Sequence, residues 1–253
     1  MKYLISFIIR KVPRKYLQLV SDIALKFIAI FYIGNKVEDP ISGKTYRKFL
    51  PYGRIPRENA LCPGSLSLER HRLMWLYLKE KTNFFTAPQK LLHIAPEHCF
   101  INRFEALKNL DYITADIESP LAKVKMDIHH IPFPDNTFDV CFCNHVMEHV
   151  DDDIRAMSEI HRVLKPGGWA IIQSPIDYTI ADTFEDPTIT SPAEREKVFG
   201  QNDHVRLYGR DYPQRLERAG FKVTEDDFVM QMSDEKIFRY GLSKGEYIYY
   251  CVK

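Results

Sequence analysis

Short apolar runs alternate with segments of helical periodicity through most of the chain. Seven of these runs have the length and composition of β-strands: residues 90–95, 111–116, 123–127, 138–143, 169–174, 221–228 and 246–253. A helix is predicted to open at residues 151–153, since Ile154, Met157, Ile160 and Leu164 form one stripe before a Lys-Pro-Gly-Gly stop. Strands that alternate with helices imply crossover connections. Residues 67–253 are therefore predicted to form a doubly wound α/β domain with a largely parallel sheet.

Composition narrows the class of protein. The chain has 253 residues, of which 45% are hydrophobic and 27% are charged, and 35 basic side chains balance 34 acidic ones. These values are ordinary for a globular protein and exclude both a disordered chain and a strongly basic nucleic-acid binder, so no nucleic-acid partner is expected. Five scattered cysteines do not make a disulfide framework, which favours a reducing compartment such as the cytoplasm.

The first 36 residues differ from the rest in charge, because they hold seven basic side chains and one acidic one. Gln18, Asp22 and Lys26 interrupt an apolar stretch and share one helix face, which argues against a membrane-spanning helix. A signal peptide is also disfavoured, since the apolar run is short and no small-residue cleavage site follows it. Residues 1–36 are predicted to form a basic amphipathic helix. Residues 1–34 either contact the inner face of an anionic membrane peripherally or pack on a protein core.

Residues 37–66 have the spacing of a zinc ribbon without its thiolates. Where two Cys-Pro-x-Cys knuckles would hold the ion, the chain has Asp39 and Ser42 in the first pair and Cys62 and Ser65 in the second. One thiolate and one carboxylate bind zinc weakly. The segment is predicted to be a small metal-free β-hairpin, with a residual metal site as the alternative.

Polar residues stand at the ends of three predicted strands. Asp116 and Asp127 end two of them, and Asn144 directly follows a third. Ligands of open parallel sheets bind beyond the carboxyl ends of the strands. One carboxylate can accept hydrogen bonds from both ribose hydroxyls and the other from an adenine amine, while the N–H of Ile128 donates to a ring nitrogen. This row suits an adenosine. The loop at residues 95–99 lacks phosphate-binding glycines, so a dinucleotide is disfavoured.

A resemblance to a known family adds to this interpretation. The run MDIHHIPFPDNTFDVCFCNHVMEHVDDDIRAMSEIHRVLKPGGWAIIQSP, residues 126–175, resembles the core of class I S-adenosylmethionine-dependent methyltransferases of the type 11 subgroup. The resemblance covers roughly residues 90–253, and residues 199–223 resemble the terminal region of some bacterial members. It implies a seven-stranded Rossmann-like sheet with an antiparallel last strand. It also implies S-adenosyl-L-methionine as cofactor and methyl transfer as the activity.

The resemblance assigns roles to five residues. Asp116 matches the position that binds the ribose, and the neighbouring pair Asp127 and Ile128 matches the position that binds adenine. Asn144 and His145 match positions that line the methionine end of the cofactor.

The first motif departs from the family pattern. Where the family has Asp-x-Gly-x-Gly, this chain has His93, Ile94, Ala95, Pro96 and Glu97 in order. Ala95 still allows close approach of a ligand, and Glu97 is a candidate to contact the methionine ammonium. Ala95, Pro96 and Glu97 are thus the cofactor-binding candidates of this loop.

The expected chemistry is an in-line SN2 transfer in which the protein mainly aligns the reactants. If the acceptor must lose a proton, the candidate bases are His145, His149 and His204, because imidazole titrates near neutrality. Each of them can instead be a packing or surface histidine. The long segment 177–212 holds a basic and aromatic cluster, comprising His204, Arg206, Tyr208 and Arg210. The cluster suits a small-molecule, glycan or lipid-headgroup acceptor, or it forms salt bridges with nearby acids.

Two alternatives belong to other functional classes. His145 to His149 reads H-x-x-E-H, so on a helix both histidines could grip a zinc ion while Glu148 activates water, as in a zinc hydrolase. The degenerate first motif also allows a non-catalytic scaffold with an adenosine-binding fold.

Overall fold

The computed structural model describes residues 28–253. The amphipathic helix predicted over residues 1–36 therefore lies mostly outside the described part of the chain, of which residues 28–31 are helical. Among residues 28–253, no helix is both long and apolar enough to cross a bilayer. The chain divides into two compact units.

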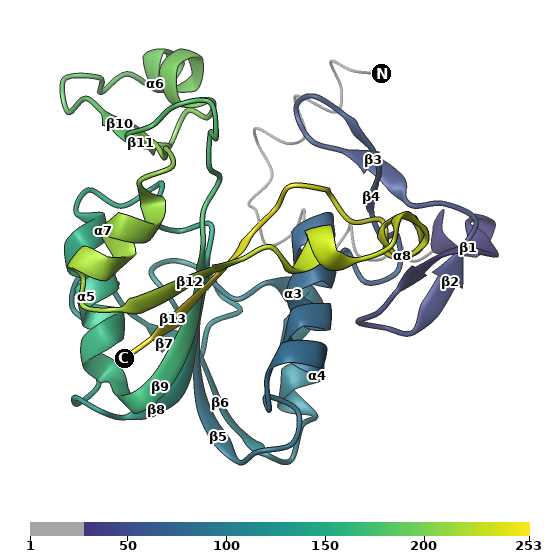
Figure 1. Cartoon of the computed structure of the whole chain (residues 1–253), viewed down its shortest axis with the longest axis horizontal. Helices are drawn as coiled ribbons and strands as arrows, with labels where there is room; N and C mark the ends of the chain where they lie inside the picture. The colour runs from purple at the N-terminus through teal and green to yellow at the C-terminus, as the bar shows by residue number, and fades with distance from the viewer. Residues whose placement is uncertain (1–27) are drawn as a thin grey trace. The chain divides into compact units, whose positions relative to one another are not determined.

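The first unit, called the hairpin unit, comprises the chain up to Thr82 together with residues 98–103 and 229–246. Its strands form two antiparallel pairs, β1 (Ile33–Asp39) with β2 (Lys44–Tyr46) and β3 (Leu50–Tyr52) with β4 (Arg57–Leu61). Its helices are α3 (Glu69–Lys81) and α8 (Asp234–Tyr240) (Figure 1). The segment expected to form one hairpin thus forms two, because chain reversals follow both β1 and β3. A small core of Val37, Tyr46, Phe49 and Cys62 lies between them.

Asp39 and Ser42 stand at the first pair of positions where a zinc ribbon would have its ligands, and they are hydrogen-bonded to each other. The carboxylate of Asp39 accepts hydrogen bonds from the hydroxyls of Ser42 (2.6 Å) and Ser67 (3.0 Å). Burial, with the nearby charge of Asp39, raises the pKa of the Cys62 thiol, so the sulfur carries its proton at neutral pH. These bonds tie the first turn of the hairpin unit to the residues that precede α3.

Arg72 of α3 fixes the rest of the hairpin unit. Its guanidinium is fully buried and donates hydrogen bonds to the backbone carbonyls of Ala60 (2.9 Å), Ser67 (2.8 Å), Tyr240 (2.6 Å) and Gly241 (2.6 Å). A buried cation is tolerated only where its donors are satisfied, and here backbone oxygens satisfy them. The side chain therefore joins β4, α3 and α8.

The second unit, called the sheet unit, comprises residues 83–97, 104–228 and 247–253. Its seven-stranded sheet has the order β12-β13-β9-β8-β5-β6-β7. The strands are β5 (Gln89–Ile94), β6 (Leu110–Asp116), β7 (Val124–Lys125), β8 (Phe138–Asn144), β9 (Leu164–Gln173), β12 (Lys222–Asp226) and β13 (Ile248–Val252). All neighbouring pairs are parallel except those made by β13, which runs antiparallel to both β9 and β12. The predicted Rossmann-like sheet with an antiparallel last strand is confirmed.

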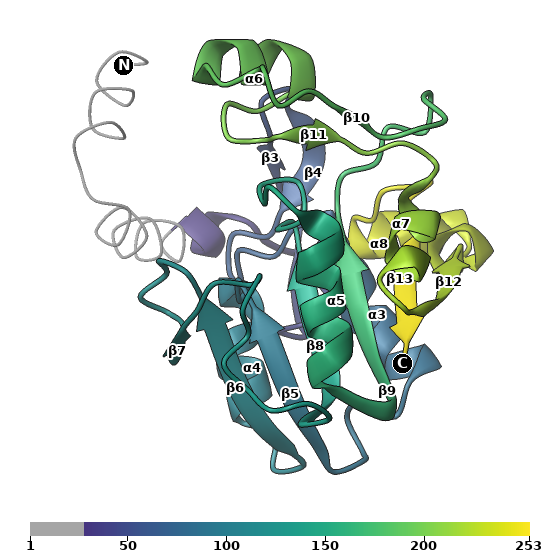
Figure 2. The ribbon, with the colours of Figure 1, turned by 90° about the vertical axis from the view of Figure 1, so that its left-hand side faces the viewer.

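Two apolar layers enclose this sheet. Helices α5 (Asp153–Val163) and α7 (Tyr212–Arg218) lie over one face, as Figure 2 shows for α5 in front of the central strands. On that face β8 contributes Cys141 and Cys143 to the main core, and α5 contributes Met157 and Ile160. Aromatic side chains fill the opposite face, namely Phe84, Phe104, Phe142 and Trp169. Burial on both faces explains why β8 reads as a continuous apolar run.

Strand β9 begins earlier than the sequence predicts. The Lys-Pro-Gly-Gly stretch expected to stop the preceding helix lies inside the strand, because Leu164 pairs with Phe138 and the register then shifts before Val140 pairs with Trp169. Gly167 lies in the left-handed region with a φ of 75°, which places the irregularity at this glycine. The helix α5 itself ends at Val163, close to the prediction.

The remaining elements connect these parts. In the sheet unit, β10 (Phe184–Glu185) pairs antiparallel with β11 (Arg206–Leu207), and α6 (Pro192–Phe199) lies between them in the chain. The chain passes from one unit to the other within α4 (His98–Glu105) and within the short 3-10 helix η1 (Phe228–Gln231).

Candidate functional site

Three neighbouring strands of the sheet unit end side by side. In the parallel ladders, Ile94 of β5 pairs with Ala115 of β6 on one side and with Cys143 of β8 on the other. The next residues, Ala95, Asp116 and Asn144, are therefore level with one another at the carboxyl edge, about 5 Å apart from strand to strand. Two of the three polar groups of the predicted row, Asp116 and Asn144, thus share one edge of the sheet, whereas Asp127 lies two residues beyond the end of β7. We call this edge the strand-end site.

Glu97 belongs to the strand-end site through two side chains. Its Oε2 atom lies 2.5 Å from Nε2 of His93, which is fully buried in β5, and its Oε1 atom accepts a hydrogen bond from the amide of Asn144 at 2.8 Å. The other ring nitrogen of His93 lies 2.9 Å from the hydroxyl of Tyr112. The carboxylate is therefore held between the ends of β5 and β8. Sequence reasoning named Glu97 and Asn144 but missed His93 as the group that orients them.

Two residues at this edge adopt a backbone conformation that favours glycine. Ala95 has a φ of 50° and His145 a φ of 56°. Each follows its strand at the edge, and each N–H donates to a neighbouring strand, from Ala95 to Ala115 O (2.9 Å) and from His145 to Gln173 O (2.7 Å). Left-handed non-glycine residues concentrate at functional sites, where surrounding contacts hold them in place.

Asp116 uses one carboxylate oxygen to shape its own loop. Oδ1 accepts hydrogen bonds from the backbone N–H groups of Glu118 (2.7 Å) and Ser119 (2.6 Å), which forms a tight turn directly after β6. These bonds use Oδ1 and leave Oδ2 as the atom for a ligand hydroxyl. The next side chain, Ile117, is 59% exposed, so an apolar surface lies beside the carboxylate.

Asp127 and Ile128 face different surroundings. The carboxylate of Asp127 is exposed and accepts a hydrogen bond from the backbone N–H of His129 (2.9 Å), and it lies 2.8 Å from the His129 imidazole. These two bonds hold the pKa of Asp127 below its ordinary value. The side chain of Ile128 is buried in the main core of the sheet unit. The buried side chain thus anchors the loop on which the acid is presented.

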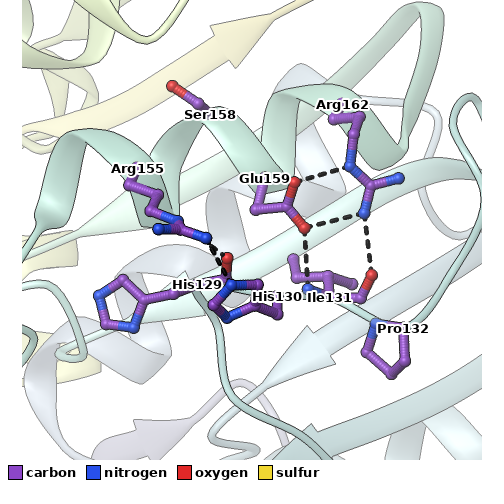
Figure 3. Close-up of a pocket in the computed structure, with 8 residues that line it drawn as sticks. All are labelled: His129, His130, Ile131, Pro132, Arg155, Ser158, Glu159 and Arg162. Atoms are coloured by element: carbon purple, nitrogen blue, oxygen red, sulfur yellow. Dashed lines mark hydrogen bonds and ion pairs between the residues drawn. The ribbon is translucent and has the colours of Figure 1, made fainter.

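The segment that follows Asp127 is fastened to α5 (Figure 3). Glu159 accepts a hydrogen bond from the N–H of Ile131 (2.8 Å), and Arg162 donates to the carbonyl oxygens of Ile131 (2.9 Å) and Phe133 (2.9 Å). A pocket of about 420 Å³ lies between this segment and α5; its lining includes His129, His130, Arg155, Ser158, Glu159 and Arg162. Asp116 and Asn144 are absent from this lining. We therefore assign the Glu159 and Arg162 contacts to positioning of the loop that carries Asp127.

The three histidines predicted as bases converge on Glu148. His145 Nδ1 lies 3.1 Å from Glu148 Oε1, and the other carboxylate oxygen accepts a hydrogen bond from the Ser174 hydroxyl at 3.1 Å. Burial raises the pKa of Glu148, but the hydrogen bond and charge of His145 outweigh it, so that pKa lies below its ordinary value. The rings of His149 and His204 meet edge to face at 4.8 Å. Burial lowers the pKa of His204.

The alternative in which His145 and His149 lie on a helix as an H-x-x-E-H zinc grip is wrong. Residues 147–149 form a turn, and α5 begins only at Asp153. The chain turns here because His145 takes a left-handed conformation that starts no helix. The zinc hydrolase alternative therefore loses its geometric basis.

Two members of the predicted acceptor cluster are structural. Arg206 is buried and donates to the carbonyl oxygens of Met147 (2.6 Å), Val150 (2.5 Å) and Asp151 (2.9 Å). Tyr208 is also buried, and its hydroxyl donates to Asp153 at 2.8 Å. Both side chains hold the turn after β8 against β11. Of the two alternatives stated for this cluster, Arg206 follows the salt bridge, since its guanidinium lies 3.1 Å from the Glu185 carboxylate.

Comparisons with known proteins agree with this arrangement. Residues 97–172 match a family described as "Methyltransferase domain". Among curated relatives, an uncharacterized methyltransferase of Schizosaccharomyces pombe is 48% identical over 82 residues, which are 32% of this chain and 27% of the relative. A tRNA U34 carboxymethyltransferase of Nautilia profundicola is 35% identical over 89 residues, which are 35% of this chain and 28% of the relative.

The S-adenosylmethionine-dependent methyltransferase from Mesorhizobium loti is 15% identical, with a TM-score of 0.47, and the match covers 71% of this chain and 97% of that one. The chain spans between about a fifth and two fifths of the length of the curated relatives it matches. The matched residues 97–172 include Asp116, Asp127, Asn144 and His145.

Proposed function

We propose that the protein is an S-adenosyl-L-methionine-dependent methyltransferase that transfers a methyl group to an oxygen or nitrogen acceptor. The observation that carries the proposal is the strand-end site, where Glu97, Asp116 and Asn144 lie at the carboxyl edge of three adjacent parallel strands and Glu97 contacts Asn144. These residues lie in the segment that matches the methyltransferase domain. A fold alone does not specify an activity, but acidic groups at these strand ends match the polar groups of one cofactor.

The residues present fit the cofactor in three places. Asp116 has Oδ2 available for the ribose hydroxyls, because its turn uses Oδ1. Asp127 is exposed and, as a carboxylate whose pKa is lowered further, is anionic at neutral pH, so it can accept from the adenine amine. Glu97 replaces a glycine of the family motif, and His93 and Asn144 pin its carboxylate where it can bind the methionine ammonium.

When bound, the cofactor supplies a methyl group already activated by the sulfonium. The chain's own residues then bind and orient the reactants. His145 is the favoured base, because its Nδ1 contacts Glu148 and its Nε2 is then the atom to take a proton from the acceptor. The buried Glu148 carboxylate would stabilise the imidazolium that forms, as an orienting acid does for other catalytic histidines.

The acceptor and the location are further proposals. We infer a small-molecule, glycan or lipid-headgroup acceptor, and peripheral contact of residues 1–34 with a membrane. The inference of membrane contact is supported by the apolar side chains of Ile30, Phe31 and Ile33, which are exposed at the end of this segment. Residues 37–66 are proposed to be a zinc-ribbon-like module in which the bonds of Asp39 replace a ligand pair.

Calorimetric titration of the full chain with S-adenosylmethionine and its demethylated product tests the proposal. Saturable binding of one cofactor per chain is expected. Incubation with radiolabelled cofactor and fractions of small molecules, glycans and lipids then identifies the acceptor. No binding at about millimolar ligand, which is weaker than about −4 kcal/mol, would refute the proposal and favour the scaffold alternative.

A further inference from the structure

We propose a binding site for a divalent transition-metal ion formed by Glu148, His149 and His204. One potential ligand atom from each of these side chains lies within 4.8 Å of the others. Donor atoms that share one ion at about 2.1 Å stand roughly 3.0–3.4 Å apart, so small rotations complete the site. His149 is exposed and has room for such a rotation.

His204 provides an independent observation that points to a ligand. The residue is 5% exposed, and its Nε2 atom is buried without a hydrogen-bond partner in the described part of the chain. The ring is hydrogen-bonded to the backbone of Phe199, which leaves Nδ1 as the atom that makes this contact. A buried polar atom without a partner is costly, and coordination of an ion by Nε2 would satisfy it.

His149 shows the same division between its ring nitrogens. Its Nδ1 lies 3.3 Å from the carbonyl oxygen of Asp203 and 3.5 Å from that residue's carboxylate. Metal-binding histidines usually direct their second nitrogen to such an oxygen, which fixes the ring and its tautomer. Nε2 of His149 is thereby the atom for the ion.

Backbone contacts hold the two histidine-bearing segments together. The N–H of Val205 donates to the carbonyl oxygen of Glu148 at 2.9 Å, and Arg206 donates to the carbonyl oxygens of the same turn. The third ligand, Glu148, is nearly fully buried and is oriented by His145 and Ser174. The backbone of both segments and the Glu148 carboxylate are therefore already in place, and only the imidazoles must rotate to bind an ion.

The donor set defines the chemistry of the ion. Two imidazoles and one carboxylate suit ions such as Zn²⁺, Fe²⁺ or Co²⁺ better than Mg²⁺ or Ca²⁺, which prefer oxygen. Three protein ligands leave coordination positions open for water or another oxygen ligand. His145 contacts the carboxylate through Nδ1 and is not a ligand, so this site differs from the H-x-x-E-H grip. Binding of the ion requires no cofactor. The site shares Glu148 with the proposed base His145, but it contains none of the proposed cofactor-binding residues.

The test is zinc titration of the full chain after chelator treatment and dialysis, with Co²⁺ absorption as a second probe of imidazole ligation. One ion per chain is expected, and His149→Gln and His204→Gln should each weaken binding at least tenfold. His161→Gln is the matched control, because His161 lies near the end of α5 against Phe221. The zinc affinity of this variant should equal that of the wild type. His149→Gln changes an exposed side chain, so its folding is not in question.

Two results would overturn the inference: no stoichiometric binding at about 100 μM Zn²⁺, or equal affinity in the wild type and the His149→Gln variant. Titration of the same proteins with the demethylated cofactor separates this site from the proposed function. Cofactor binding without zinc binding would refute the metal site alone, whereas zinc binding without cofactor binding would support the metal site and refute the proposed function.

Discussion

Asp116 is the residue whose replacement tests the strand-end site most directly. The carboxylate has two tasks in the proposed complex, since Oδ1 holds the turn after β6 and Oδ2 would accept from the ribose. Asp116→Ala would remove both the turn bonds and the ribose contact. A loss of cofactor binding could then not be assigned to either of them. Asp116→Asn keeps an oxygen that accepts from Glu118 and Ser119, so the turn survives while the negative charge and one acceptor are lost.

The magnitude follows from the number of hydrogen bonds at stake. A hydrogen bond to a charged group contributes about 1.5–3 kcal/mol, and the variant forfeits about one such bond to the ribose. The dissociation constant for the demethylated cofactor should therefore rise about 10- to 150-fold, since about 1.4 kcal/mol corresponds to a factor of ten. The free energy of unfolding should change by less than about 0.5 kcal/mol, because the turn is retained.

Calorimetry on three proteins provides the measurement. The control is Asp111→Asn, at the opposite end of the same strand, where an exposed carboxylate lies 3.6 Å from Lys90. A ligand that lacks the 2′-hydroxyl should bind the wild type more weakly than the demethylated cofactor does. The affinity for this ligand should also fall much less in Asp116→Asn than the affinity for the demethylated cofactor. If Asp116→Asn and Asp111→Asn bind the cofactor equally well, the assignment of Asp116 to the ribose is refuted.

Three further predictions concern neighbouring residues. Ala95→Gly should raise the free energy of unfolding by up to about 1 kcal/mol in urea denaturation, because a left-handed φ of 50° strains alanine and not glycine; a less stable variant would contradict this. Glu97→Gln should weaken binding of the demethylated cofactor about tenfold and leave adenosine binding unchanged, and equal losses for both ligands would argue against an ammonium contact. Asp153 accepts hydrogen bonds from Arg215 (2.7 Å) and Tyr208 (2.8 Å); burial raises its pKa, but these partners outweigh it and leave the pKa below 3.8. The unfolded chain therefore takes up this proton first as the pH falls, so the stabilisation is full above about pH 4 and is lost below it. Asp153→Asn should be about 3 kcal/mol less stable at pH 7, with a difference that shrinks in acid denaturation scans; a constant difference would exclude this ionic origin.

The sheet could be predicted from sequence because the burial of each strand is recorded in the residues of its own short segment. A strand buried on both faces, such as β8, needs an unbroken apolar run, and such runs stand out in a polar chain. The polar residues that end these strands, Asp116 and Asn144, could be placed at one edge by the rule that parallel strands end together. Strand β7 was predicted less well, because only Val124 and Lys125 pair there and the following residues turn toward α5.

Side-chain partnerships between distant residues could not be predicted. The spacing of His145 and His149 suggested a helix, but the left-handed His145 and the carbonyl contacts of Arg206 hold a turn instead. Arg206 and Tyr208 looked like an acceptor cluster because their residue types suit ligands as well as structure. Only the fold shows that Arg206 is buried against a turn about 55 residues earlier in the chain, at Asp151.

The two departures in the first motif explain each other. A histidine in the interior of β5 is costly unless both ring nitrogens have partners, and His93 finds them in Tyr112 and Glu97. Glu97 in turn needs a fixed position to act on a ligand, and His93 with Asn144 supplies it. At the position where the resembled motif has its acid, this chain has His93 in β5, and its acid, Glu97, lies four residues later on the loop. The carboxylate stays at the same strand end, so the loss of the glycine pattern does not by itself imply the loss of cofactor binding.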